Sequence, residues 1–412
     1  MDKKAISLIV SAMFAIPLAA WSQDDAAPTA VAKGGSSLQI FGRAYVEYSF
    51  GSNRGQLGSA AGASAGELIS LDLLQAPDNE IGFRGQENLG SGISAWFQCA
   101  STMDLRGAGT GAGAAGFCSR NSAIGIKGAF GNAYAGNWDT PLKKTAGAVR
   151  VVNSTGIWGA SLILFGNSAT TNDNAQPTTW SRRQNNSIFY DTPVWNGIQV
   201  FTAMSTPSTS VGVTSNQSGG KPRLYSIAAN YSNGPILLTA GYEIHQNFKP
   251  GQPVNGNYSG TDTGYHLGAR YEIGPGRVGV IYTKQKLDTG AGTDANVSAW
   301  GIGSEWTVSG PHALRAGYHR ANSTTGNFVA GPGATLLPQS DNRVFNGGRG
   351  DTGGSLWQIS YVYVASKRTE LTAGYVAVRN DANARYFLSG YSAAPASGQN
   401  QSAFGMSIKN TF

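Results

Sequence analysis

Apolar and polar residues alternate one by one along most of this chain, which is the period of an extended strand. The last eleven residues show the pattern clearly, because Phe404, Met406, Ile408 and Phe412 fall on alternate positions. Side chains two residues apart lie on the same face of a strand, so these four share one face and polar residues occupy the other. The pattern predicts strands that meet an apolar medium on one side and water on the other.

The same alternation recurs from residue 36 onward. It is clearest over 38–50, 265–273, 314–319 and 357–363, where the polar partners include arginine, glutamate and glycine. Strands of this kind are typical of an outer-membrane β-barrel, because lipid covers one face and a watery lumen covers the other.

The connections between these segments fall into two length classes that alternate along the chain. Seven short turn signals lie at 88–92, 130–132, 192–197, 232–235, 274–276, 309–311 and 365–368. Eight long polar stretches lie at about 51–78, 105–118, 141–181, 207–221, 248–261, 287–295, 321–354 and 381–401. This alternation predicts an all-β fold, a transmembrane antiparallel β-barrel of 16 strands, whose closure removes the sheet edges that hydrocarbon does not tolerate. A soluble β-sandwich or propeller does not explain the two loop classes.

Composition narrows the class further. Only 13% of the residues are charged, yet the mean hydropathy is −0.20, which excludes a helical membrane protein and is unusual for a soluble enzyme. The 57 glycines exceed ordinary globular usage. We interpret a subset of them as relieving crowding on a curved wall. This subset includes Gly268, Gly301, Gly303, Gly317 and Gly374.

The N-terminus predicts export. Charged residues at 2–4 precede an apolar stretch at 5–20, and Ala20 and Ser22 supply the small residues of a cleavage site. The alternative, a membrane anchor, falls short of the ~20 apolar residues that a spanning helix requires. We expect a signal peptide at 1–22, an N-terminal extension at 23–35 and a barrel domain at 36–412. The formal net charge is +7, but no basic cluster indicates nucleic-acid binding.

Strand parity predicts which charged side chains line the lumen. On the first two strands, four charged residues fall on the face opposite the apolar one. They are Arg43, Glu47, Glu80 and Arg84. Arg183 also points inward, because Ile188 and Tyr190 of its strand take the lipid face.

Four stretches of the chain resemble sequence motifs of a known family and occur in the same order as in that family. They are 81–92, 120–131, 183–190, and 366–369 together with the terminal Phe412. In this order they resemble successive strands, turns and the C-terminus of the Gram-negative general porins, which are sixteen-stranded trimeric diffusion channels. The resemblance implies an outer-membrane channel for passive diffusion of ions and small hydrophilic solutes. It also implies a homotrimer that contacts outer-membrane lipid and lipopolysaccharide, and no cofactor.

The resemblance further implies that loop 3, about 141–181, folds into the barrel and narrows it. In the family, an arginine ladder on the wall opposes acids on this loop, and the resulting field screens solutes. Arg120 and Arg183 match two ladder positions, whereas Glu80 stands at a third, where arginine is typical. Arg120 shares its parity with lipid-facing isoleucines, so an inward Arg120 requires a bulge or irregular residue between them.

Loop 3 and its flanks carry more cations than carboxylates. The cations are Lys143, Lys144, Arg150, Arg182 and Arg183, and the carboxylates are Asp139 and Asp173. We therefore predict a pore constriction that prefers anions, an effect that Glu80 opposes.

The two cysteines, Cys99 and Cys118, flank loop 2 on neighbouring strands. Export permits a disulfide, and closing a loop of this size contributes ~3 kcal/mol on an entropic model. Two free thiols are the alternative. No cysteine–histidine cluster predicts a metal site.

Two other functions stay open. A substrate-specific channel would show a continuous row of aromatic side chains, or a closely spaced row of basic side chains, along the pore. A barrel enzyme needs a nucleophile, a base and an orienting group at one rim. The histidines do not form such a site. By strand parity His245, His266 and His319 take lumen-facing positions, and His312 lies in a turn. We therefore predict a channel and not an enzyme.

Overall fold

The computed structural model of the chain describes residues 29–32, 36–54, 68–106, 116–152, 155–165, 180–206, 223–246, 260–290, 293–327, 350–389 and 397–412. The signal peptide predicted at 1–22 lies outside these residues. Strands dominate what is described, and short helices lie between β7 and β8. Among the described residues, no helix has the length and apolarity that crossing a membrane would require.

The first half of the barrel is built from ten strands and three short helices. These are β1 (Thr29–Ala32), β2 (Ser36–Arg54), β3 (Leu68–Gln75), β4 (Glu80–Gly90), β5 (Ile93–Thr102), β6 (Ser122–Gly128), β7 (Gly131–Asp139), α2 (Pro141–Val149), the 3-10 helix η1 (Gly156–Trp158), α3 (Ser161–Phe165), β8 (Arg183–Asp191), β9 (Ile198–Ser205) and β10 (Arg223–Asn233). The second half is built from strands alone. These are β11 (Ile236–Gln246), β12 (Thr261–Ile273), β13 (Gly276–Gly290), β14 (Thr293–Ser309), β15 (His312–Ala321), β16 (Thr325–Gly326), β17 (Gly354–Val364), β18 (Thr369–Asn380) and β19 (Gln401–Thr411).

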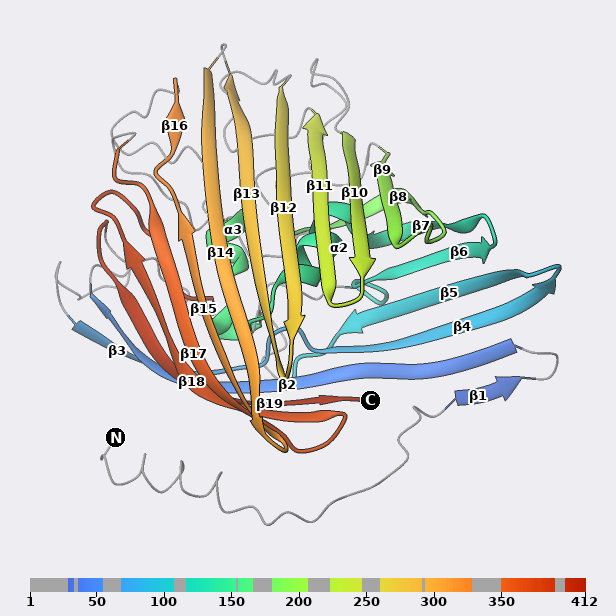
Figure 1. Cartoon of the computed structure of the whole chain (residues 1–412), viewed down its shortest axis with the longest axis horizontal. Coiled ribbons are helices and arrows are strands. Elements are labelled where there is room, and N and C mark those ends of the chain that lie inside the picture. The colour runs from blue at the N-terminus through green and yellow to red at the C-terminus, as the bar shows by residue number, and fades with distance from the viewer. Residues whose placement is uncertain are drawn as a thin grey trace.

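The strands close into one antiparallel ring (Figure 1). β19 closes it by pairing along its whole length with β2. β3 and β4 pair with successive halves of β2, so together they form one strand that is interrupted at 76–79. In the same way β16 continues β15 along β14, and β1 pairs only with the first residues of β2. The ring therefore has sixteen strands, which confirms the number predicted from the turns and loops.

The seven predicted short turns all join neighbouring strands, but two predicted long loops are partly wrong. In the loop predicted at 51–78, residues 51–54 belong to β2 and 68–75 form β3, which pairs with β2. The second is 287–295. β13 continues to Gly290 and β14 begins at Thr293, so 287–295 is almost entirely strand. The inward side chains Leu287, Ala295 and Val297 are buried there. Toward this rim, water lies outside the barrel and protein fills the inside. The polarity pattern of the strand is therefore inverted, so the sequence pattern predicts a polar loop where the structure has strand.

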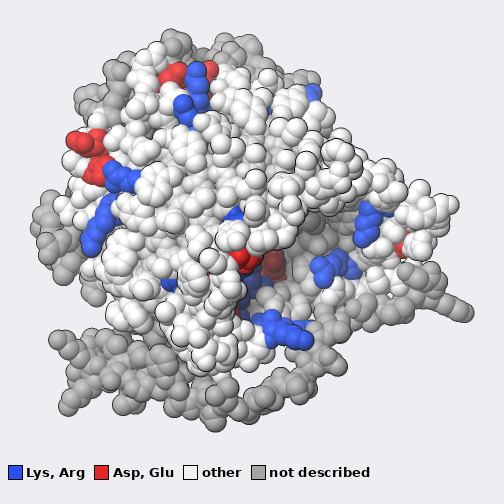
Figure 2. Space-filling model, in the orientation of Figure 1, with Lys and Arg blue, Asp and Glu red and all other residues white. Residues whose placement is uncertain are grey.

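The outward face of the ring is apolar. Ile124, Ile188 and Leu267 are each more than half exposed. In Figure 2 the face toward the viewer is mostly free of charged side chains, which gather near its edges and in the central hollow. Water does not favour so much exposed apolar surface, whereas lipid does.

Loop 3 fills part of the bore. Thr140 accepts a hydrogen bond from the backbone N–H of Lys143, which caps α2, and Pro141 is the first residue of the helix. α2 packs against β10–β13, and α3 packs against β13, β14, β15 and β17 (Figure 1). The main hydrophobic core includes Leu142 from α2, Trp158 from η1 and Phe165 from α3. The core of this barrel is therefore the contact between loop 3 and one side of the inner wall.

Four glycines of that wall make room for loop 3, and we call them the glycine seat: Gly268, Gly279, Gly303 and Gly317. A β-carbon placed on Gly268 would lie 2.6 Å from Cγ2 of Val149. The same addition on Gly303 or Gly317 would lie 2.9 or 2.6 Å from Cγ1 of Val152. Our interpretation of Gly268, Gly303 and Gly317 as relief of wall curvature was therefore incomplete, because they admit the loop. Gly301 instead faces the ring of His319, and Gly374 faces the backbone of β17.

Candidate pore constriction

Where loop 3 stands away from the wall, a cavity of about 270 Å³ remains in the bore. Five cations and two carboxylates line it. The cations are Arg43, Arg120, Lys143, Arg150 and Arg183, and the carboxylates are Asp78 and Asp139. Strands β2 and β8, the segments before β4 and β6, the end of β7, and loop 3 all contribute. Six of the ten residues predicted for the constriction thus line one cavity, and a seventh, Glu80, binds two of them.

Glu80 lies between two of the cations. Nε of Arg120 donates to Oε2 of Glu80 at 2.7 Å, and Nη2 of Arg43 is 4.0 Å from Oε1. Arg43 also donates twice to the backbone carbonyl of Asp78, at 2.9 and 2.7 Å, while Nη2 of Arg120 lies 3.6 Å from the Asp78 carboxylate. This half of the cavity therefore has two cations that are both opposed by nearby acids.

Arg120 reaches the cavity because it precedes the regular strand. β6 begins at Ser122, and residues 120–121 form a bend, so the parity of Ile124 and Ile126 does not extend to Arg120. The backbone N–H of Arg120 donates to the carbonyl of Ala100 at 2.8 Å, which fixes this turn of the chain.

A second ionic group surrounds Asp139 at the end of β7. Nζ of Lys143 lies 2.8 Å and Nε of Arg183 lies 3.6 Å from its Oδ1. Asn121 links the same groups, because its Oδ1 accepts from Nε of Arg183 at 2.6 Å and its Nδ2 donates to Asp139. Burial, together with the neighbouring Arg183 cation, lowers the pKa of Lys143 despite the opposing effect of Asp139.

Arg150 is the cation of the cavity that has no carboxylate within ion-pair distance in the described part of the chain. It follows α2, and its Nη1 donates to Oγ of Ser161 at the start of α3. Burial lowers the pKa of Arg150 from its high ordinary value. Since Arg43, Arg120, Lys143 and Arg183 face nearby acids, Arg150 is the least compensated positive charge in the cavity.

Three predicted constriction residues lie elsewhere. Arg84 has the predicted inward parity, but its Nε donates to Gln39 and it lines a separate polar cavity of about 400 Å³. Nζ of Lys144 binds Asp191 at 2.9 Å and lies 3.9 Å from the ring centroid of Phe201. Arg84 lies outside the narrow cavity because the alternation of a strand fixes the face of a side chain but not its depth along the bore. Lys144 lies on α2, where strand alternation gives no information about direction.

Glu47 is the third, and it is completely buried. Its Oε1 accepts from the backbone N–H of Ile157 in loop 3 at 3.1 Å and from Gln75 at 2.5 Å, and its Oε2 accepts from the hydroxyl of Tyr45 at 2.5 Å. Glu47 therefore anchors η1 to β2. The prediction that it lines the water-filled constriction is wrong, because loop 3 covers it.

Sequence reasoning missed Asp78, Asn121 and Ser161. Asp78 lies in the interruption between β3 and β4 with a φ of 60°, and Pro77 before it was the available signal for a break. Nothing in the local pattern marks Asn121 or Ser161, whose roles depend on partners 62 and 11 residues away. Asp173, predicted as an acid of loop 3, lies outside the described residues.

The remaining candidates take structural positions. Cys99 and Cys118 form a disulfide in the structure, with Cα atoms 4.7 Å apart. His245, His266 and His319 face the inside and are buried. Nε2 of His266 lies 3.3 Å from Oγ1 of Thr145, so this histidine contacts α2.

A closed antiparallel barrel with an apolar exterior and a charged constriction inside belongs to the class of outer-membrane channels. The sequence matches the family model described as Gram-negative porin over residues 7–383. This chain therefore belongs to the Gram-negative porin family, and it is a protein of the outer membrane.

Known proteins agree with this assignment. The chain is 30% identical to the major outer membrane protein P.IB of Neisseria gonorrhoeae over 158 residues, which are 38% of this chain and only 38% of that relative. The anion-selective porin from Comamonas acidovorans has a TM-score of 0.68 at 19% identity, covering 92% of this chain and all of the other. A trimer form of OmpT from Vibrio cholerae has a TM-score of 0.60 at 15% identity, covering 92% and 99%. At these identities, the two structures support the fold alone.

Proposed function

We propose that this protein is a general diffusion channel, through which ions and small hydrophilic solutes cross the outer membrane passively, with a preference for anions. The observation that carries the proposal is the cavity beside loop 3, where cations outnumber carboxylates and Arg150 has no acidic partner among the described residues. A fixed positive charge in a narrow bore lowers the energy of a passing anion and raises that of a cation.

Glu80 makes the preference moderate. Its carboxylate lies against Arg120 and Arg43, so it offsets part of their field. The anion-selective porin from Comamonas acidovorans shares this fold, which supports an anion preference here by analogy. A substrate-specific channel is the alternative, and saturable flux of one solute would favour it.

We further propose a homotrimer whose subunits contact outer-membrane lipid, after removal of the signal peptide at 1–22. The trimer form of OmpT from Vibrio cholerae supports this by analogy. A barrel enzyme is the weaker candidate, because the buried histidines contact structural partners such as Thr145 and Glu243.

The test is the reversal potential of purified channels in a planar bilayer under a potassium chloride gradient. The wild type is expected to prefer chloride. Arg150→Gln should lower the chloride permeability and raise the potassium permeability by up to about fivefold each, since a unit charge at ~4 Å in water contributes ~1 kcal/mol. The chloride-to-potassium permeability ratio should therefore fall.

Arg84→Gln is the matched control, because it removes the same charge from the inner wall at a separate cavity. It should change the ratio much less than Arg150→Gln. A wild-type channel that prefers potassium, or equal effects of the two substitutions, would contradict the proposal.

A further inference from the structure

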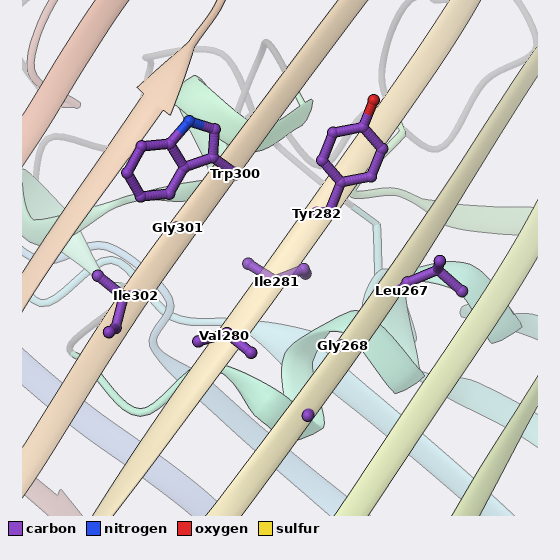
Figure 3. Close-up of a pocket in the computed structure, with 9 residues that line it drawn as sticks. Leu267, Gly268, Val280, Ile281, Tyr282, Trp300, Gly301 and Ile302 are labelled. Carbon is purple, nitrogen blue, oxygen red and sulfur yellow. The ribbon is translucent and has the colours of Figure 1, made fainter.

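The outer wall carries an apolar groove over β12, β13 and β14 (Figure 3). Its volume is about 460 Å³. Val280 and Ala269 are the small residues in its middle, directly opposite each other on neighbouring strands. Larger side chains bound it. They are Leu267, Tyr282, Trp300 and Ile302. A flexible hydrocarbon chain fits such a groove better than a flat wall, since it gains contacts on both sides.

Aromatic side chains mark one end of this groove. Tyr282 pairs directly with Trp300, and both belong to a row that continues on either side. The ring centroids of Tyr265 and Tyr282 are 6.1 Å apart, and those of Trp300 and Tyr318 are 5.5 Å apart. Rows of tyrosine and tryptophan on a barrel wall lie where hydrocarbon meets the polar headgroups. The groove therefore begins in hydrocarbon and ends at the headgroup level.

The next outward position of β13 beyond Tyr282 is Lys284, which is exposed. It lies ~14 Å along the strand from Val280, or ~10 Å along the membrane normal for a strand tilted by ~45°. Its neighbours across the sheet are Tyr265 and Ser298, neither of them acidic. Among the described residues, no carboxylate pairs with Lys284, although Asp294 binds the adjacent Lys286 at 3.1 Å.

The position of Lys284 identifies the leaflet. β13 starts at the short turn 274–275 and runs toward the rim of long loops. Short turns face the periplasm in outer-membrane barrels and long loops face the exterior. Lys284 consequently stands at the headgroups of the outer leaflet.

We propose that this groove binds one phosphate-bearing anionic lipid of the outer leaflet. Its acyl chain lies over Val280 between Leu267 and Ile302, and its phosphate lies at the ammonium group of Lys284. Tyr282 and Trp300 contact the part of the lipid between its acyl chain and its phosphate, at the depth where an amphipathic ring is most stable.

The comparison with Arg320 supports the choice of Lys284. Arg320 is also an outward cation and lies opposite Trp300, but both of its terminal nitrogens bind the carboxylate of Asp381. Its charge is therefore already neutralised. Lys284 combines an uncompensated positive charge with an adjacent apolar groove. Together they complement the negative headgroup and the hydrocarbon chain of an anionic lipid.

The test uses native mass spectrometry of the full-length mature channel, released from detergent that contains either diphosphoryl lipid A or zwitterionic phosphatidylethanolamine. The wild type should retain lipid A in preference. Lys284→Gln should retain about fivefold less lipid A at the same lipid concentration, the factor expected for one lysine near an anionic surface. Val280→Trp should also reduce retention, because it fills the groove.

Arg379→Gln is the matched control, since Arg379 is an exposed outward cation on β18 away from the groove. It should retain lipid A as the wild type does, and excess inorganic phosphate should displace no lipid. Unchanged retention in Lys284→Gln would overturn the proposal. So would an equal loss in Arg379→Gln, equal retention of the two lipids by the wild type, or displacement by phosphate. If Val280→Trp does not fold, Lys284→Gln decides alone.

Channel conductance separates this inference from the proposed function. Lys284 lies outside the bore, so Lys284→Gln should conduct chloride as the wild type does. A protein that binds lipid but does not conduct would contradict the proposed function and leave the lipid site supported.

Discussion

The two sides of the inner wall are built from the same kind of antiparallel strand, yet they present opposite surfaces. Beside α2, inward positions of β12–β15 hold the glycine seat. Across the bore, β2, β4, β7 and β8 and the residues next to them present the charged groups of the constriction. One side is covered by the apolar face of loop 3, and the other faces the cavity except at Glu47 of β2, which η1 covers.

The difference shows that the inward face of a barrel strand has no single character. Where loop 3 excludes water, an unpaired charge would be costly to bury, so the wall has small or hydrogen-bonded side chains. Thr283 and Gln285, for example, donate to the carbonyl of Leu164 at 2.7 and 2.9 Å. Where water remains, charged side chains keep their hydration and can act on solutes.

Filling the glycine seat should have the largest effect. In Gly268→Leu the new side chain would overlap Val149, so we expect α2 to leave the wall and the constriction to widen. Overpacking of this kind costs ~1–3 kcal/mol. Single-channel conductance should rise and its solute size limit should increase, as measured in planar bilayers and by liposome swelling with sugars of graded size.

Ala269→Leu is the control, because Ala269 is the next residue of β12 and lines the apolar groove on the outer wall. Its conductance should remain that of the wild type. If Gly268→Leu folds and conducts normally, loop 3 does not need this seat.

Removing Glu47, which anchors η1 of loop 3 to β2, should have an intermediate effect. In Glu47→Ala three donors lose their acceptor, namely the hydroxyl of Tyr45, Nε2 of Gln75 and the N–H of Ile157. Each buried group left without a partner costs ~1–3 kcal/mol. We expect η1 to detach intermittently, which current recordings would report as frequent closures.

Glu47→Gln keeps one acceptor oxygen for Ile157 and should show fewer closures than Glu47→Ala. Steady currents in Glu47→Ala would mean that the glycine seat alone holds loop 3.

Titration of Lys143 should have the smallest effect. Burial and Arg183 lower the pKa of Lys143, so its ammonium loses its proton at a lower pH than an ordinary lysine does. Because the charged form prevails below the pKa, anion preference should fall as the pH rises through the alkaline range. The reversal potential, measured at a series of pH values, tests this.

Lys143→Gln should remove most of this alkaline change, while Lys144→Gln should leave it intact, since Lys144 binds Asp191 outside the cavity. An identical pH response in wild type and Lys143→Gln would exclude Lys143 as the titrating group.

The barrel itself could be predicted because its rule is local. Each membrane-facing segment between two turns repeats the same alternation, and the seven tight turns carry their own glycine, proline and asparagine signals. The prediction was wrong at 68–75, which forms β3 inside a predicted loop. It was also wrong at 287–295, where the inward residues of β13 and β14 pack on protein rather than facing water.

The candidate site was predictable only in part. Parity placed Arg43, Glu80 and Arg183 on the inner face, and the structure brings them to one cavity or its edge. Parity could not separate them from Arg84, because the depth of a residue along the bore depends on the register of many strands. Nor could it show that loop 3 covers Glu47, since that contact joins residues 110 positions apart.

The sequence by itself determined that this chain forms a closed wall with lipid outside and water inside. The reason is that apolar and polar residues alternate along the membrane-facing part of each strand. Only the tertiary structure decided where loop 3 lies, which inward residues it covers, and which charges remain in the open bore. Those outcomes depend on van der Waals contact and ion pairing between distant segments, and no local pattern encodes such contacts.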